Sequence, residues 1–392
     1  MSDKTRTSLT YADAGVDIAL GDDVSQIFYN AARQTWENRK GKLGEVIAPF
    51  DDFSGVRAID VSSLPAGTLM NMGLDGVGTK IEVAEGLNQH HTIANDLIAM
   101  ICDDAVVRGA EPVLVGSILD VNSLKDENKK PYLDQARQLA YGYVCAAKLA
   151  NVAIINGETA ELGNRVNGIG GFNYNWGGAV VWFANRARLL TGKKIIPGDS
   201  LVGLQEQGFR SNGLSLVRRL MEEFHGNDWY KQYNVGIFGN QRLGEVVLRP
   251  SKIYTMAVVD MFGGYDLERR PRAEIHGVAH ITGGGLPGKL GRMLKPSGLG
   301  AVIDNPFDTP RIMMYIRGFT NGRLSEEECY RTWNMGQGMV IATPEPEKVM
   351  EVAEEHGIKS QRIGYVKGER GIEIKNRASY LLKPENPVLY FA

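Results

Sequence analysis

Cysteine is scarce in this chain of 392 residues, where only Cys102, Cys145 and Cys329 occur, far apart from one another. Such scattered cysteines supply neither a disulfide framework nor the paired spacing of a thiolate metal site. An excess of charge is also missing, since 44 basic and 46 acidic residues leave a formal charge of −2. The balance excludes the basic surface of a nucleic-acid or anionic-membrane binder, although a local site for a small phosphorylated ligand needs no global charge.

Long apolar runs are absent as well. Residues 1–15 contain no apolar stretch of the kind found in signal peptides. No run approaches the roughly 18 residues that span a bilayer, and the longest, at 177–184, has the length of a strand. The sequence therefore predicts a cytoplasmic protein without a membrane segment.

Glycine, by contrast, is abundant, with 47 residues against the roughly 7% of an average protein. Much glycine indicates tight turns and loops whose backbone amides can approach a ligand closely. The length exceeds the ~150 residues of one domain, and the segment 186–200 carries a strong turn signal at Pro197-Gly198-Asp199. We therefore expect two domains, comprising residues 1–188 and 189–392.

Hydrophobic periodicity predicts alternating helices and strands in both halves. The first helix is expected to begin at a cap formed by Asp22 or Asp23. The expected helices are 22–39, 92–107, 132–150 and 214–224, and the expected strands are 68–72, 111–121, 152–157 and 177–184.

A glycine-rich turn at 73–80, with the sequence GLDGVGTK, is the first chemical signal. A P-loop requires lysine before Ser/Thr, whereas Thr79 precedes Lys80 here, so we reject a Walker NTPase. Small residues still allow amides to approach a phosphate, Asp75 can hold Mg²⁺, and Lys80 supplies a cation. The alternative is a glycine-rich hairpin with a solvated Asp and Lys.

Three acids interrupt the apolar helix expected at 92–107, namely Asp96, Asp103 and Asp104. At 100° per residue, Asp103 lies about 20° from Asp96 and Asp104 about 80°, so all three can share one side. Like charges on a half-buried face favour a neutralising cation, and hard oxygen ligands suit Mg²⁺. The alternative is a solvated face whose acids lie near Arg108.

Two further segments carry weaker signals. Glu158 and Glu161 follow an expected strand, where α/β proteins often place ligand groups, although a helix N-terminal turn explains them equally well. The loop TGGG, Thr282 to Gly285, opens a helix and offers amides to an anion. His276 and His280 lack the glutamate of a zinc motif, so a structural or phosphate-facing histidine is expected.

Eight motifs in this order closely resemble those of the phosphoribosylformylglycinamidine cyclo-ligase family, also called the aminoimidazole ribonucleotide synthetase family. They extend over nearly the whole chain and are YADAGVDI (11–18), GLDGVGTK (73–80), NDLIAMICDDAVVRGAEP (95–112), NGETAEL (156–162), RSNGLSLVRR (210–219), AHITGGG (279–285), YRTWNMGQGM (330–339) and RIGYVKG (362–368).

The resemblance implies an α+β fold of two domains. An N-terminal sheet would form a barrel with that of a second copy in a homodimer, ATP would bind near that interface, and a C-terminal mixed sheet with helices would bind the substrate. It also implies the reaction, in which formylglycinamidine ribonucleotide and ATP, with Mg²⁺, give aminoimidazole ribonucleotide, ADP and phosphate. This reaction belongs to de novo purine synthesis.

The resemblance also implies roles for individual residues. Asp75, Lys80 and Asp104 would form the catalytic site, and residues 15–17 would belong to a stretch that covers the nucleotide. The implied metal ligands are Asp75, Asp104 and Glu158; the implied ATP and phosphate contacts are Gly76, Gly78, Thr79, Lys80 and Asp96; and the implied substrate contacts are Ser211, Asn212, Thr282, Gly283, Gly284 and Gly285.

The chain departs from the family pattern at several positions. Arg210 stands where the family usually has histidine, and an arginine can bind phosphate but cannot act as a neutral base. Smaller departures are Leu74, Asn156 and Asp103, and the segments 122–133 and beyond 370 are extra. The alternatives are another ATP-using enzyme of the same superfamily, such as thiamine-monophosphate kinase, or a catalytically inactive dimeric scaffold.

Overall fold

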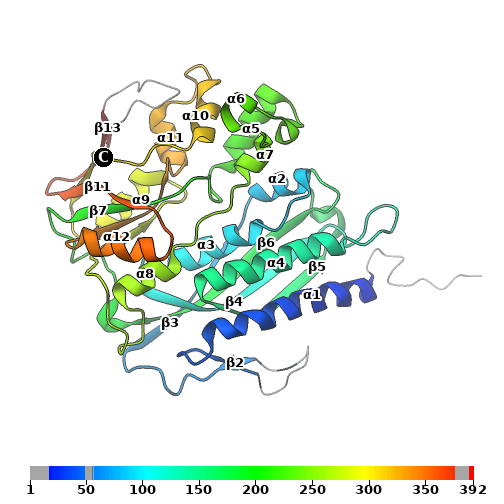
Figure 1. Cartoon of the computed structure of the whole chain (residues 1–392), viewed down its shortest axis with the longest axis horizontal. Helices are drawn as coiled ribbons and strands as arrows, with labels where there is room; N and C mark the ends of the chain where they lie inside the picture. The colour runs from blue at the N-terminus through cyan, green and yellow to red at the C-terminus, as the bar shows by residue number, and fades with distance from the viewer. Residues whose placement is uncertain (1–16, 49–54, 56, 376–387) are drawn as a thin grey trace, which may run out of the picture.

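The computed structural model describes residues 17–48, 55, 57–375 and 388–392. It contains two β-sheets with helices packed on them, so the α+β class and the two-domain arrangement predicted from the sequence are confirmed (Figure 1). The N-terminal segment expected to cover the nucleotide lies outside the described residues, except for Asp17.

The N-terminal sheet has four strands in the order β3-β6-β4-β5. Only the β4–β5 pair is parallel, and the other two pairs are antiparallel. Its strands are β3 (Thr68–Gly76), β4 (Ala110–Val121), β5 (Ala153–Glu161) and β6 (Tyr174–Asn185).

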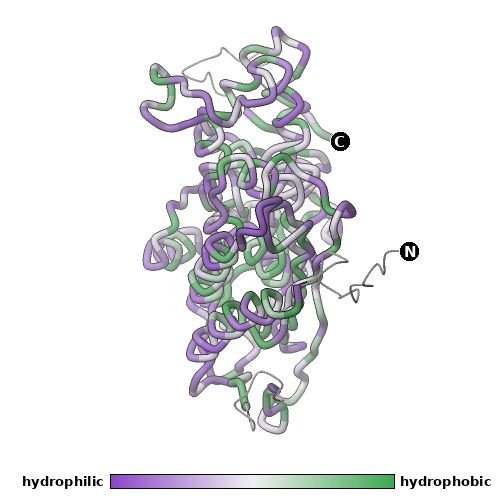
Figure 2. Tube along the Cα trace, turned by 90° about the vertical axis from the view of Figure 1, so that its right-hand side faces the viewer, coloured by the Kyte–Doolittle hydropathy of each residue, from purple (hydrophilic) through white to green (hydrophobic). Residues whose placement is uncertain are grey.

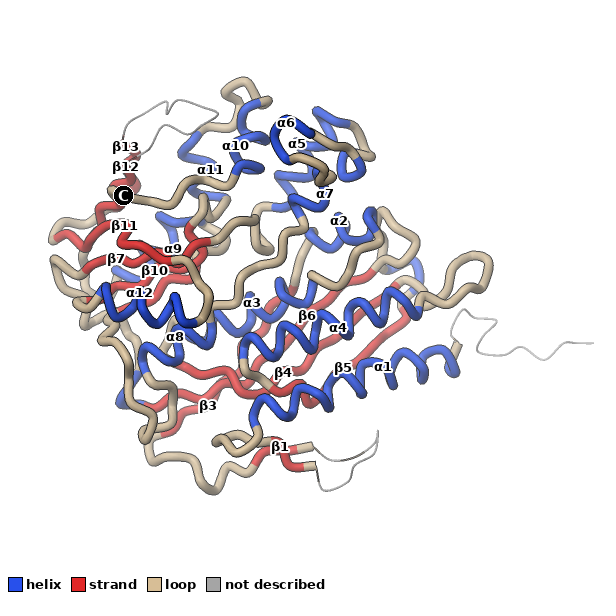
Figure 3. Tube along the Cα trace, viewed as in Figure 1, coloured by secondary structure: helices blue, strands red, loops and turns tan. Residues whose placement is uncertain are grey.

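Three long helices cover one face of this sheet, as the blue layer over the red strands in Figure 3 shows. They are α1 (Ile18–Trp36), α3 (Ile93–Val106) and α4 (Leu133–Ala150). Gly178 of β6 faces this layer, because a Cβ there would lie 3.2 Å from the Leu97 side chain of α3. On the edge strand β5, the Ile154 carbonyl accepts a hydrogen bond from Trp36 Nε1 of α1 over 2.9 Å.

Among the residues that the structure describes, little covers the other face of the N-terminal sheet. The small hairpin β1 (Val46–Ile47) and β2 (Ala58–Ile59) packs against Phe183 at one end. Beyond it, the face exposes large apolar side chains at fractions of 52–70%, namely Met70, Met72, Leu74 and Ile118. Side chains alternate along a strand, so the even-numbered residues of β3 lie together on this face. We call these four residues the open apolar face.

The C-terminal sheet has seven strands in the order β13-β12-β9-β11-β7-β10-β8, and only the β12–β9 pair is parallel. It is therefore mixed, as expected. The strands are β7 (Ser200–Gln205), β8 (Gly277–His280), β9 (Gly300–Ile303), β10 (Gln337–Thr343), β11 (Ser360–Lys367), β12 (Ile372–Lys375) and β13 (Val388–Phe391).

Helices lie on both faces of the C-terminal sheet. One face packs on α8 and α12 through a cluster that includes Val202, Ile341 and Val258, and the other faces α9. The helices not yet given are α2 (Lys80–Leu87), α5 (Leu214–His225), α6 (Val235–Phe238), α7 (Leu243–Val247), α8 (Thr255–Phe262), α9 (Gly285–Leu294), α10 (Arg311–Gly318), α11 (Glu326–Thr332) and α12 (Pro346–Glu355).

Most expected elements are present, but three boundaries differ. Helix α1 begins at Ile18 rather than near residue 22, because Asp17 caps it and accepts from Leu20 N over 3.3 Å. Strand β3 continues through Gly76, since residues 73–76 pair with β6, so the turn is confined to 77–79. Strand β5 likewise continues to Glu161, because Glu158 pairs with Ile118. Glu158 is therefore a strand residue rather than one that follows a strand.

Polar and apolar residues alternate along the trace in Figure 2. Among the residues that the structure describes, no helix is long and apolar enough to cross a membrane.

Candidate active site

Helix α3 lies between the two halves of the molecule and carries three acids with very different surroundings. Asp96 and Asp103 have 0% of their surface exposed, whereas the Asp104 side chain is 55% exposed. Periodicity places all three on one side of the helix, but about two turns, on the order of 10 Å, separate Asp96 from the other two. Packing rather than angular position therefore separates their roles.

Asp103 is neutralised by Arg210 from the loop after β7. Arg210 Nη2 lies 2.9 Å from Asp103 Oδ2, and both side chains are fully buried. The other carboxylate oxygen accepts from Tyr254 N over 3.0 Å and from Thr255 Oγ1 over 2.9 Å. A buried carboxylate with a paired cation and two further donors is satisfied without a metal.

Asp96 is neutralised by Lys80, the first residue of α2. Lys80 Nζ lies 2.8 Å from Asp96 Oδ1 and also donates to the Arg249 carbonyl over 2.7 Å, with both charged side chains at 0% exposure. Ser251 Oγ donates to the same carboxylate oxygen. The ammonium therefore points inward, away from the glycine loop.

The hypothesis that one cation neutralises all three acids of α3 is wrong for Asp96 and Asp103. Lys80 and Arg210 neutralise them instead, and the second comes from the C-terminal half of the chain. The roles of Lys80 and Asp96 at the nucleotide stay predictions, which this buried pairing does not support.

Asp75 and Asp104 form the accessible acidic pair. Partial burial raises the pKa of Asp75, and the negative charge of nearby Asp104 raises it further. Burial also opposes ionisation of Asp104, but the hydrogen bond from His280 and the charge of Lys289 hold its pKa below the usual value. Lys289 of α9 interacts with both acids, and burial lowers the pKa of this lysine. The sequence analysis missed Lys289, since nothing local connects it to residues 75 and 104.

This acidic pair fits a magnesium ion better than a metal bound only by protein. Mg²⁺ prefers oxygen ligands and commonly takes one or two carboxylates together with substrate phosphates and water. Within the described part of the chain, no group of three or more His, Cys, Asp or Glu residues could hold a metal ion. Asp75 and Asp104 thus supply the donor chemistry for an ion that a phosphate also binds.

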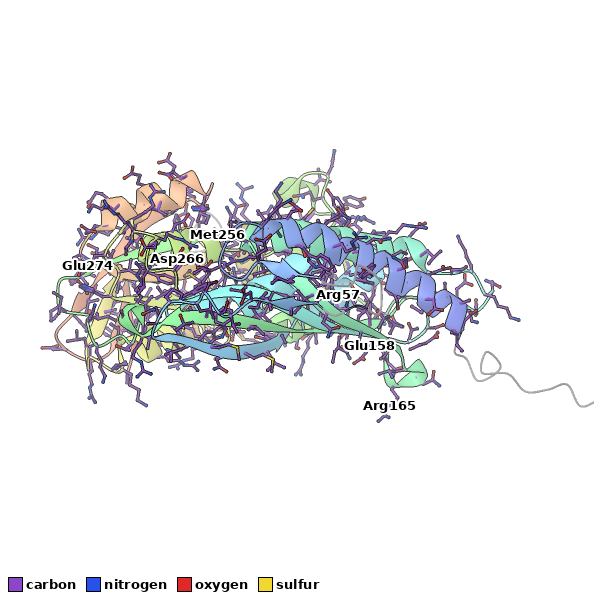
Figure 4. All side chains as sticks on the ribbon, turned by 90° about the horizontal axis from the view of Figure 1, so that it is seen from below. Arg57, Glu158, Arg165, Met256, Asp266 and Glu274 are labelled. Carbon is purple, nitrogen blue, oxygen red and sulfur yellow. The ribbon has the colours of Figure 1, made fainter. Side chains whose placement is uncertain are left out.

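Glu158 lies apart from that pair. Register places Gly76, Gly177, Ile118 and Glu158 in one row across the sheet, one residue along from Asp75. Three strand spacings separate Glu158 from β3, on the order of 14 Å, and alternation turns its side chain to the opposite face from Asp75. Figure 4 labels Glu158 at the sheet, with α1 on the other side of the layer. Within one chain the structure does not bring Glu158 to Asp75 and Asp104.

The two segments expected to bind the substrate do meet. Asn212 Oδ1 accepts from Gly283 N over 3.1 Å, which joins Ser211 and Asn212 to the loop 282–285. The described part of the chain offers no hydrogen-bond partner to the buried Ser211 Oγ. A Cβ at Gly285 (φ +60°) would lie 1.8 Å from the Tyr330 carbonyl, so only glycine fits there. Exposed Gly283 and Gly284 precede α9, where amides are available to an anion.

The glycine turn lies beside these segments. Gly76 ends β3, and exposed Gly78 has a φ of +71°, where an added Cβ would meet no atom within 4 Å. Thr79 Oγ1 lies 3.2 Å from Ser215 Oγ of α5. Residues 76–79 and the Ser211 segment therefore border one region.

Both histidines of the HGVAH segment face carboxylates. His280 Nδ1 lies 2.6 Å from Asp104 Oδ1, and His276 Nδ1 lies 2.7 Å from Asp199 Oδ2. The phosphate-facing alternative for these residues is not what the structure shows. Neither a sequence motif nor spacing indicates the His280–Asp104 contact, because 176 positions separate the two residues.

Comparisons with known proteins identify the family of this chain. A family model described as AIR synthase related protein, N-terminal domain, matches residues 57–174, and the corresponding C-terminal domain model matches 197–376. A phosphoribosylformylglycinamidine cyclo-ligase of Thermococcus kodakarensis is 33% identical over 94% of this chain and 98% of its own. One from Anaeromyxobacter is 35% identical over 94% and 99%.

Solved structures support the fold alone. Thiamine-monophosphate kinase from Stenotrophomonas maltophilia gives a TM-score of 0.61 at 14% identity, covering 90% of this chain and 97% of the other. Hydrogenase maturation protein HypE in complex with ATP gives 0.52 at 16% identity, covering 84% and 88%. The full-length relatives carry the assignment, and the chain belongs to the phosphoribosylformylglycinamidine cyclo-ligase family of AIR synthase-related proteins.

Proposed function

We propose that this protein closes the imidazole ring of aminoimidazole ribonucleotide from formylglycinamidine ribonucleotide, using ATP. The observation that carries the proposal is identity of 33–35% to cyclo-ligases over about 94% of the chain. The site chemistry agrees, because accessible acids and glycine loops are present where a phosphoryl transfer needs charge neutralisation and positioning.

The reaction requires that the formyl oxygen become a leaving group. Transfer of the γ-phosphoryl group of ATP to that oxygen gives ADP and an iminophosphate. The substrate nitrogen that carries the ribose then attacks the formyl carbon, the C–O bond breaks, and inorganic phosphate leaves with the oxygen. A proton is lost as the ring forms. Because the attack is intramolecular, holding the substrate folded supplies much of the rate.

We assign the nucleotide side of the site to Asp75 and Asp104, with the turn 76–79 at the phosphates. A bound Mg²⁺ would neutralise phosphate charge there. Lys289 adds a cation beside the pair, since it interacts with both acids. Lys80 and Asp96 contribute by holding α2 against α3 through their buried ion pair.

We assign the substrate's ribose phosphate to Ser211, Asn212 and the loop 282–285. The buried Ser211 hydroxyl, which has no partner among the described residues, and the exposed amides before α9 support this assignment.

We also retain residues 1–188 as the ATP-binding and dimerisation domain and 189–392 as the substrate domain. The last strand of the first sheet ends at Asn185 and the first strand of the second begins at Ser200. None of the three cysteines forms a disulfide within the described residues, in keeping with the cytoplasmic location that we propose.

The experiment that tests the function is product identification. Purified protein incubated with formylglycinamidine ribonucleotide, ATP and Mg²⁺ should release phosphate and form aminoimidazole ribonucleotide, identified by mass spectrometry. Removing Mg²⁺ with a chelator should abolish both products. ATP hydrolysis that yields another product from this substrate would exclude the cyclo-ligase and favour another enzyme of the superfamily.

Nucleotide binding separates an enzyme from an inactive scaffold. Saturation with Mg-ATP at about 100 times the Kd should stabilise the native state by ~2.7 kcal/mol, measured as a rise in Tm. AMP at the same concentration is the control, since it lacks the β- and γ-phosphates that the acidic pair would serve. No rise in Tm with Mg-ATP would support the inactive scaffold.

We further propose a homodimer through the open apolar face. Four large apolar side chains with 52–70% exposure lie on one sheet face, and large contiguous apolar patches on a protein surface mark interaction sites. The same face carries Glu158, whereas Asp75 faces the helical layer, so the metal role of Glu158 stays a prediction that this interface does not support.

Leu74→Asp tests this dimer. A charge at the centre of the face would be buried without a partner, which is costly, so sedimentation velocity should show a monomer in place of the wild-type dimer. Leu149→Asp is the matched control, because Leu149 is 55% exposed on α4 in the helical layer. A monomeric wild type, or a variant at Leu74 that stays dimeric, would contradict the interface.

A further inference from the structure

A continuous row of hydrogen bonds connects the interior to the accessible acid Asp104. Arg210 Nη1 donates to Glu206 Oε2 over 3.0 Å, and Arg210 Nη2 donates to Asp103 Oδ2 over 2.9 Å. The same Nη2 lies 2.8 Å from His280 Nε2, and His280 Nδ1 lies 2.6 Å from Asp104 Oδ1. Glu206, Asp103 and Arg210 are fully or almost fully buried, and His280 is 3% exposed.

The chemistry of arginine decides which nitrogen of His280 carries the proton. A guanidinium only donates hydrogen bonds, so the His280 nitrogen that faces it must accept. Nε2 therefore holds the lone pair, and the ring proton resides on Nδ1. Nδ1–H then donates to Asp104 Oδ1, so every hydrogen bond of the row has one donor and one acceptor.

Arg210 is held firmly enough to impose this arrangement. Its backbone φ is +58°, in the left-handed region, and its side chain is 0% exposed. Nη1 donates to the Lys252 carbonyl over 2.8 Å as well as to Glu206, and the guanidinium carbon lies 5.2 Å from the centre of the Tyr254 ring. Two carboxylates, a carbonyl and an aromatic ring thus keep Nη2 aimed at His280.

His280 in turn orients Asp104. The hydrogen bond from His280 to Oδ1 holds the Asp104 carboxylate at the end of β8. The Asp104 side chain stays 55% exposed there and interacts with the charges of Asp75 and Lys289. Carboxylates that bind metal ions commonly have such a partner, and its loss weakens metal affinity.

We propose that Arg210 and His280 are positioning residues of this site: Arg210 holds His280 as its Nδ1–H tautomer, and His280 holds Asp104 ready for a magnesium-bound phosphate. The role toward the ion rests on the proposed function, whereas the tautomer does not. A lysine at position 210 has a single donor nitrogen and could not serve Asp103, Glu206 and His280 from one planar group.

The tautomer is measured by nitrogen NMR of the ligand-free full chain labelled with ¹⁵N-histidine. The His280 signals are assigned by their disappearance in His280→Asn. We expect a pyrrole-type shift at Nδ1 and a pyridine-type shift at Nε2. A pyrrole-type shift at Nε2, or at both nitrogens, would overturn the proposal. In Asp104→Ala, where the carboxylate no longer favours Nδ1–H and Arg210 still faces Nε2, we expect the Nδ1–H form to persist, and a mixture of tautomers there would refute the role of Arg210.

A pair of His280 variants tests the effect on the metal without any turnover. His280→Phe removes both ring nitrogens, whereas His280→Asn restores only a donor toward Asp104. Mn²⁺ binding in the presence of ADP, followed by water proton relaxation, should weaken about 10- to 100-fold in the Phe variant and recover most of this loss in the Asn variant. His276→Asn, whose ring contacts Asp199 and Glu274, should bind as the wild type does.

Equal weakening in the Phe and Asn variants would mean that His280 only fills space, and the positioning role would be rejected. The NMR result also separates this inference from the proposed function. If His280 has the Nδ1–H tautomer but the protein makes no aminoimidazole product, the tautomer assignment stands and the cyclo-ligase function is rejected. If the protein makes the product but His280 has the other tautomer, the function stands and the tautomer assignment is rejected.

Discussion

Replacing Arg210 by leucine is expected to lower the free energy of unfolding by about 3–5 kcal/mol. The substitution leaves Asp103 and Glu206 buried without their cation, and both lie within 3.0 Å of the guanidinium in the wild type. Removing one member of a buried ionic group is far more costly than the net worth of the pair, because the remaining charge stays desolvated. Urea denaturation followed by tryptophan fluorescence measures the change.

The control for this prediction is Arg137→Leu on α4. Arg137 pairs with Asp134, but the two side chains are 59% and 86% exposed, so the cost should stay below about 1 kcal/mol. If Arg210→Leu lowered the free energy of unfolding as little as Arg137→Leu, the buried acids Asp103 and Glu206 would have to be neutralised by another group.

Asp104→Asn is expected to reduce kcat/KM by roughly 10²–10³-fold, equivalent to several kcal/mol of transition-state charge stabilisation. The asparagine oxygen still accepts from His280 Nδ1, so the fold and the position of the side chain should be kept. What disappears is the negative charge that a divalent ion needs beside Asp75. Steady-state assays across a range of Mg²⁺ concentrations measure the effect.

Asp134→Asn provides the matched control, because Asp134 is 86% exposed in the first turn of α4, outside the junction of the sheets. It should keep wild-type kinetics. If Asp104→Asn were as active as this control at every Mg²⁺ concentration, Asp104 would not belong to the nucleotide site.

Local patterns predicted most of the architecture. The helices α3 and α4 and the strands β4 and β6 lie where periodicity indicated them, because each buries a regular apolar face. Periodicity failed at residues 73–76 and 158–161, where glycine and polar residues suggested turns. These segments are strands because β6 and β4 pair with them, and such pairing is a tertiary contact.

The site was predicted unevenly for the same reason. Motif order led to the family, and the Ser211 segment and the loop 282–285 meet as expected. Spacing along α3 put Asp96, Asp103 and Asp104 on one side of the helix but could not tell that each has a different partner or that Asp104 meets solvent. It also could not reveal His280 or Lys289, which come from distant parts of the chain.

Composition, periodicity and motif order were thus sufficient for the fold class, the family and the segments that make the site. Burial and pairing of each charge arose only when the chain folded, since Arg210 reaches Asp103 across 107 positions and His280 reaches Asp104 across 176. The desolvation of a carboxylate and the cation that compensates it depend on such long-range neighbours, and no local pattern contains them.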